Sequence, residues 1–200
     1  MEPLIDISAR ILAVGTGASA NTVVDGLLRL HASKQFARPI TLYVIGGTDG
    51  SASLTAADAL LIVSVMQVVR SPIRTVGLGW LRNWLPILLA GGTHGQRYLL
   101  PQTLIDLAPL EWGSLPQPRI PIGLRPTPPE AEPRRAEQVL ERQFRDLLAK
   151  SNLPPDLFAK NRLLTAQEAI KSRLADHVVD RTITPQLSTS HTPIPHEPQF

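Results

Sequence analysis

The stretch Gly77–Pro101, GLGWLRNWLPILLAGGTHGQRYLLP, carries the strongest indication of the fold in this sequence. It reads as the end of a strand, a tight turn, an apolar helix over about 80–91 and a second strand at RYLL. Several hydrolase folds hold a nucleophile at the turn between such a strand and helix. Yet no serine lies between Ser71 and Ser114, and the chain has no cysteine.

The segments that precede this stretch alternate between strands and helices. Short apolar runs typical of buried strands occur at 11–14 (ILAV), 40–45 (ITLYVI) and 73–78 (IRTVGL). Between them, helical spacing of apolar residues predicts one helix that includes Val23, Val24, Leu27 and Leu28, and another over about 56–70. Short links between these elements predict parallel βαβ units and therefore an α/β fold with right-handed crossovers.

The chain changes character after a further expected strand at LIDLA. Residues 114–133 hold seven of the nineteen prolines and predict an extended loop, because proline cannot pair in an interior strand. An amphipathic helix is expected over 134–151, and TAQE at 165–168 predicts a capping box before a short helix and a last strand at HVVD. We expect one domain over 1–181 and a disordered tail over 182–200, which is rich in proline, serine and threonine.

Composition excludes several classes of protein. The net charge is +3, but no run of four basic residues marks a nucleic-acid-binding surface. The longest apolar segment, Trp84–Gly92, is far shorter than the ~20 residues that a membrane-spanning helix needs. Without a recognisable signal peptide or any cysteine, the sequence leads us to expect a cytoplasmic protein without membrane partners.

Three further patterns are interpreted as structural. GTGASA at 15–20 imitates a dinucleotide-binding turn, but no acidic residue follows the second strand where the ribose would be held. The five histidines are not spaced as metal ligands. Trp80 and Trp84, one helical turn apart, are expected to pack in the core or an interface. We therefore expect no cofactor and no metal.

Several strings resemble the proteolytic subunit of the Clp protease, ClpP, a member of the ClpP/crotonase superfamily. LYVI with its glycine-rich loop is similar to that family's strand and glycine loop, and LLAGGTHGQRYLLPQTLI to its helix end, turn and following strand. LLTAQEAIKSRLADHVVD is similar to its final segment. The resemblance, over about 9–181, implies a ClpP/crotonase-like fold of repeated βαβ units with a small antiparallel handle extension and a long handle helix.

The resemblance also implies where a Ser-His-Asp triad would lie. Aligned without gaps, the nucleophile position falls on Asn83, the base position on Ala108 and the acid position on Leu157. None of these side chains can perform its role. A one-residue slip would bring Asp156 to the acid position, whereas no slip supplies a serine or a histidine to the other two. Gly46, Gly47 and Gly50 are the candidates for the oxyanion loop, which carries about five extra residues here.

The resemblance therefore implies a non-catalytic subunit like the ClpR proteins, built into heptameric or double-heptameric rings beside active ClpP-like subunits, with an AAA+ unfoldase as a further candidate partner. Two alternatives remain. One is an active serine peptidase or crotonase-like acyl-thioester enzyme that uses other residues, such as Ser51 or Ser53. The other is a scaffold that forms a homomeric ring.

Overall fold

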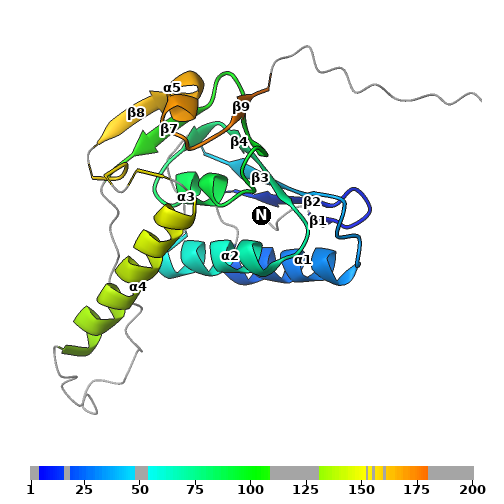
Figure 1. The fold of residues 1–200 in the computed structure, drawn as a ribbon, viewed down its shortest axis with the longest axis horizontal. Helices are drawn as coiled ribbons and strands as arrows, with labels where there is room; N and C mark the ends of the chain where they lie inside the picture. Colours follow the sequence, from blue (N-terminus) through cyan, green and yellow to red (C-terminus); the bar gives the residue numbers. More distant parts are fainter. Residues whose placement is uncertain are drawn as a thin grey trace, which may run out of the picture.

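The computed structural model describes residues 5–15, 19–47, 54–108, 131–151, 153–154, 156–159 and 161–179, with side chains from 138 onward in the helix that begins at 131. Its main sheet has the strand order β1-β2-β3-β4-β6-β9 (Figure 1). These strands are Ile5–Asp6, Ile11–Val14, Ile40–Ile45, Ile73–Leu78, Arg97–Leu99 and His177–Val178. All neighbours in the sheet are parallel except β1 and β2. The predicted parallel βαβ core is thereby confirmed.

Two helices, α1 (Ala20–Ala32) and α2 (Ala56–Val68), lie side by side along one face of this sheet (Figure 1). Alternate residues of β3 explain why: Ile40, Leu42 and Val44 are fully buried, while the residues between them are at least partly exposed. Because successive side chains of a strand point to opposite faces, the first set packs against the helices. The second set forms the opposite, half-exposed face of the sheet.

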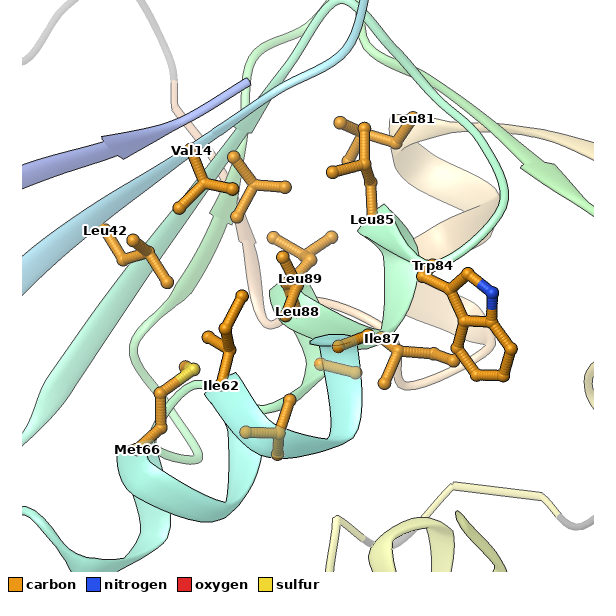
Figure 2. Packing of buried hydrophobic residues seen from close by; sticks show 14 of the residues in the cluster. Val14, Leu42, Ile62, Met66, Leu81, Trp84, Leu85, Ile87, Leu88 and Leu89 are labelled. Carbon is orange, nitrogen blue, oxygen red and sulfur yellow. The ribbon is translucent and has the colours of Figure 1, made fainter. Parts of the chain in front are cut away.

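A third helix, α3 (Leu85–Ala90), is buried on every side. Figure 2 shows Leu88 and Leu89 facing the sheet residues Val14 and Leu42 and the α2 residue Ile62, while Ile87 lies on the other side, beside Trp84. The prediction of a helix over about 80–91 is wrong at its start. Trp80–Leu81 forms a strand, β5, and the helix begins only at Leu85. Pro86 in its first turn gives up no hydrogen bond, since the first N–H groups of a helix have no partner within it.

A second, smaller sheet has the order β5-β7-β8, with β7 at Leu104–Leu107 and β8 at Arg162–Thr165. The strands expected at RYLL and LIDLA both exist, but β6 joins the main sheet and β7 the small one. The predicted capping box is confirmed: Thr165 Oγ1 accepts from the Glu168 amide, and the Glu168 carboxylate accepts from the Thr165 amide. It starts α5 (Ala166–Lys171). The short strands β1 and β8 were not expected from the sequence.

The amphipathic helix α4 spans Ala131–Lys150, so it begins three residues before the expected start at 134. A proline at 133 is compatible with this start, because it falls in the first turn. The carboxyl-terminal end of α4 lies close to α3, and the rest extends away from the sheets (Figure 1). Phe144 anchors this end through edge-to-face contacts with Trp84 and Phe158. None of the described helices is long and apolar enough to cross a membrane.

The remaining expectations for the outer segments cannot be compared with the structure. Most of the proline-rich loop and the whole tail over 182–200 lie outside the described residues. The one-domain boundary at 181 stays a prediction for the same reason.

Candidate functional site

The nucleophile position lies in the turn between β5 and α3. Asn83 has φ of 54°, in the left-handed region that non-glycine residues seldom adopt, and its side chain is exposed. Asparagine tolerates this conformation better than most residues. A residue held in the left-handed region between a strand and a helix is the backbone geometry that presents a nucleophile in other hydrolases. The turn at Asn83 therefore shares this backbone feature, while its side chain is an amide.

The base position lies beside it because of strand register. β5 and β7 are parallel, with Trp80 opposite Leu104 and Leu81 opposite Ile105. Both strands therefore end at the same edge, and Ala108, the residue after β7, lies near the turn that carries Asn83. Ala108 is half-buried and has only a methyl group. It cannot accept a proton.

The residue at the predicted acid position, Leu157, packs in the apolar core. Leu157 is 4% exposed and belongs to the apolar cluster that also contains Leu153 and Phe158. The neighbouring Asp156 is exposed, and its carboxylate forms no hydrogen bond or ion pair with any described residue. A carboxylate without a partner does not orient an imidazole. The assignment of the three positions stays a prediction, because it rests on the alignment.

Gly46, at the start of the glycine-rich loop, lies against the backbone of Gly79 and Trp80. A Cβ at Gly46 would lie 2.0 Å from the Trp80 carbonyl oxygen, and one at Gly79 would lie 2.6 Å from the Gly46 carbonyl oxygen. The Gly46 N–H donates to the Leu78 carbonyl oxygen at 2.9 Å, so this donor already serves the sheet. Gly47 is half-buried, and Gly50 lies outside the described residues. The oxyanion role of this loop stays a prediction.

An ion pair that sequence reasoning missed lies next to Asn83. Arg82 Nε donates to Asp106 Oδ2 at 2.9 Å, and the guanidinium lies 4.3 Å from the centre of the Trp80 ring. The pair continues the register of β5 and β7, since 82 and 106 follow the paired positions 81 and 105. It thereby fixes the strand that leads into the turn. Arg82 and Asp106 are 24 residues apart, and only the register of β5 and β7 brings them together, so the sequence alone could not predict this ion pair.

The two tryptophans have different environments. Trp84 is 4% exposed and packs edge-to-face on Phe144 at 6.0 Å between ring centres, which confirms core packing. Trp80 is only half-buried and supports Arg82. Within the described part of the chain, no three His, Asp or Glu side chains come together as a potential metal site. His94 is exposed in its turn and His177 stacks on Tyr98, whereas His191 and His196 lie outside the described residues.

Comparisons with known proteins agree with this architecture. The family model for Clp protease matches residues 8–108. The chain is 31% identical over 180 residues to ATP-dependent Clp protease proteolytic subunit 3 of Nocardia farcinica, which covers 86% of this chain and 75% of that protein. It is 28% identical over 180 residues to proteolytic subunit 2 of Streptomyces avermitilis, with 88% and 86% covered. The match to proteolytic subunit 2 of Thermobifida fusca is 42% identical but covers only 39% of that relative's length.

A solved structure supports the fold independently. The crystal structure of a peptidase from Plasmodium falciparum superimposes with a TM-score of 0.72 at 17% identity, over 88% of this chain and 98% of that one. At this identity the likeness concerns the fold alone. Together with the mixed sheet and its helices, it confirms the expected ClpP/crotonase-like α/β class. From the family model and the relatives that match along most of their length, we conclude that the chain belongs to the Clp protease family.

Proposed function

We propose that this chain is a non-catalytic, ClpR-type subunit of a Clp proteolytic complex, assembled in a cytoplasmic ring with active ClpP-like subunits. The observation that carries the proposal is the turn at Asn83: its backbone is held in the left-handed region, while hydroxyl, imidazole and carboxylate are all missing from the three aligned positions. A fold that serves assembly is expected to keep its backbone geometry while the catalytic side chains are lost.

Two unlike surfaces support assembly into a ring. On the helix side, Leu28 and Val68 are 50% and 78% exposed and line a shallow apolar groove between α1 and α2. On the opposite side of the sheet, Tyr98 stacks between Arg74, whose guanidinium lies 5.8 Å from the ring centre, and His177 at 5.1 Å. These side chains remain at least partly exposed. A closed ring needs two different surfaces that face each other around the circle, whereas a two-fold dimer uses one surface twice.

Co-expression with the active ClpP-like subunit of the same cell tests the assembly. The wild-type chain is expected in a mixed ring-sized particle by native mass spectrometry. Val68→Asp should remove it from that particle, because the charge lies in the apolar groove at a position too exposed to affect folding. Leu163→Asp is the matched control, since Leu163 is 58% exposed on β8, in the smaller sheet. A ring made of this chain alone would favour the homomeric scaffold instead.

Activity is tested on the chain alone. We expect no labelling by a serine-reactive probe, and no peptide hydrolysis by Ala108→His, because a base without a nucleophile cannot start acyl transfer. Labelling of the wild-type chain, or hydrolysis by that single variant, would contradict the proposal and favour an enzyme that uses Ser51 or Ser53. The proposal includes an AAA+ unfoldase as a further partner. Omission of this chain from a reconstituted ring tests whether it contributes to that contact.

A further inference from the structure

A groove of about 550 Å³ lies where the carboxyl-terminal ends of α2, α3 and α4 come together. None of its lining residues belongs to the turn at Asn83, and Val69 lines both this groove and the neighbouring apolar groove between α1 and α2. None of its lining residues is acidic, and four are basic: Arg70, His94, Arg97 and Lys150. The volume falls within the ~300–1,000 Å³ typical of small-molecule sites.

The basic residues do not contribute equally to the charge of the groove. Arg97 is buried and its guanidinium is paired with Asp176 through Nε and Nη2, so this pair is neutral overall. Arg70 and Lys150 are exposed, and neither forms an ion pair with a described residue. Arg70 is supported by the Phe36 ring at 5.7 Å. Two basic residues that line the groove, Arg70 and Lys150, are therefore unpaired among the described residues.

Two hydroxyl groups are set to donate into the same space. Ser71 is 3% exposed, and its Oγ accepts from Arg10 Nη2 at 2.9 Å. Thr93 Oγ1 accepts from the Ile73 amide at 2.9 Å. Each hydroxyl receives a hydrogen bond from the protein behind it, and neither donates to a described residue. Since a hydroxyl can accept and donate at once, both protons are available to an acceptor in the groove.

Arg10 places a further positive charge behind Ser71. Arg10 is 1% exposed, and among the described residues it donates to the Leu30 carbonyl oxygen, Ser33 Oγ and Ser71 Oγ but to no carboxylate. Burial lowers the pKa of this guanidinium, with a further contribution from Arg38. A buried charge without an opposite charge is costly. An anion bound at Ser71 would offset this cost.

The carboxyl-terminal ends of α2, α3 and α4 disfavour an anion in the groove, because each carries a partial negative charge of about half an electron on its last carbonyl groups. Part of that charge is already compensated. The Ile87 and Leu89 carbonyl oxygens accept from the amides of Gly91 and Gly92, and the Leu147 oxygen accepts from the amide of Ser151. Thr75 Oγ1 also donates to Leu89. The full charges of Arg70 and Lys150 therefore dominate at the open side of the groove.

We propose that this groove is a binding site for a phosphate-bearing small molecule. Arg70 and Lys150 would supply the charge, and Ser71 and Thr93 would donate hydrogen bonds to phosphate oxygens. Such charge-assisted hydrogen bonds are about twice as strong as neutral ones. The proposal concerns this chain alone and does not depend on its assembly into a ring.

Inorganic triphosphate is titrated into the full chain by isothermal titration calorimetry at constant ionic strength, with thermal unfolding as a second readout. Arg70→Gln and Lys150→Gln should each weaken binding by about tenfold or more, because each removes a charged partner of the phosphate oxygens. Arg162→Gln is the matched control: it makes the same charge change at an exposed residue on β8 and should leave the affinity unchanged. Bound triphosphate should also raise the Tm of the wild-type chain.

No heat and no Tm shift with the wild-type chain would overturn the proposal. Equal weakening by all three substitutions would also overturn it, because the attraction would then come from net charge rather than from the groove. Binding of a glutamate-rich peptide but not of triphosphate would assign the surface to an acidic protein partner instead. Comparable binding of triphosphate and a nucleoside triphosphate is the expected result if the phosphate chain is what the groove recognises.

Discussion

Replacing Asp176 with alanine should destabilise the protein more than any change to its other ion pairs among the described residues. Asp176 Oδ1 accepts from Arg97 Nη2 at 2.6 Å, and Oδ2 accepts from Arg97 Nε at 2.9 Å and from the amides of Gly95 and Arg97 at 2.8 and 3.0 Å. The Arg97 side chain is 3% exposed, so its charge would stay buried without a partner. Removing one member of a buried ion pair costs about 3–5 kcal/mol. At about 2–4 °C per kcal/mol for a chain of this size, the Tm should fall by about 6–20 °C.

Urea denaturation and thermal unfolding followed by circular dichroism measure this loss. Asp25→Ala is the matched control, because its ion pair with Arg29 is on the surface of α1 and should contribute only about 0.2–1 kcal/mol. The reasoning is refuted if Asp176→Ala costs no more than Asp25→Ala. Arg97→Met combined with Asp176→Leu should recover part of the lost stability, since it leaves no buried charge behind.

The same ion pair predicts a pH dependence. Burial alone would raise the pKa of Asp176, but hydrogen bonds from Arg97 outweigh it and hold the pKa below its usual range. A carboxyl with a lowered pKa in the folded state contributes stability that is complete above its unfolded pKa of about 3.9 and is lost as the pH falls through the folded value. The difference in unfolding free energy between wild type and Asp176→Ala should therefore shrink in acid. A constant difference down to pH 2 would contradict this.

Three further predictions follow from the backbone. Gly46→Ala should cost about 3 kcal/mol in urea denaturation, because its Cβ would meet the Trp80 carbonyl oxygen at 2.0 Å, whereas Gly15→Ala, with 3.5 Å to its nearest atom, should cost less than about 1 kcal/mol. Asn83→Val should cost about 1–2 kcal/mol for its left-handed backbone, and an equally mild effect of valine and glycine there would count against that conformation. Thr165→Ala should lose about 1 kcal/mol with the cap of α5, and no change in Tm would show that the cap is dispensable.

The alternating strands and helices before residue 80 could be predicted because each carries its own local signal. The runs at 40–45 and 73–78 are short and rich in β-branched residues, and the periodicity around Leu27 is helical, so their structures match the prediction closely. Thr165 and Glu168 form a capping box at the spacing that defines this motif. These features depend only on neighbouring residues.

The features that could not be predicted depend on contacts between distant segments. β5 contains only two residues and exists because β7 lies beside it, so the sequence around Trp80 was assigned to the following helix. The burial of Arg10 depends on Ser33 and Ser71, which lie on two other segments. The left-handed conformation of Asn83 also has no signal in a single sequence. Of the candidate site, the assignment of Asn83, Ala108 and Leu157 to the three positions stays a prediction, and the left-handed backbone at Asn83 was not predicted.

The burial of Leu157 has a consequence for any attempt to build a Ser-His-Asp triad at the three aligned positions. Asn83 is exposed and Ala108 only half-buried, so a hydroxyl and an imidazole could be introduced there with little disturbance of packing. A carboxylate at 157 would instead replace one of the leucines of the apolar core, where an unpaired charge costs far more than the small margin by which a domain is stable. The three substitutions therefore differ in difficulty. Those at 83 and 108 are local, whereas the one at 157 requires the surrounding core to be redesigned. Packing, more than the identity of the side chain, would therefore make an acidic residue at position 157 hard to introduce.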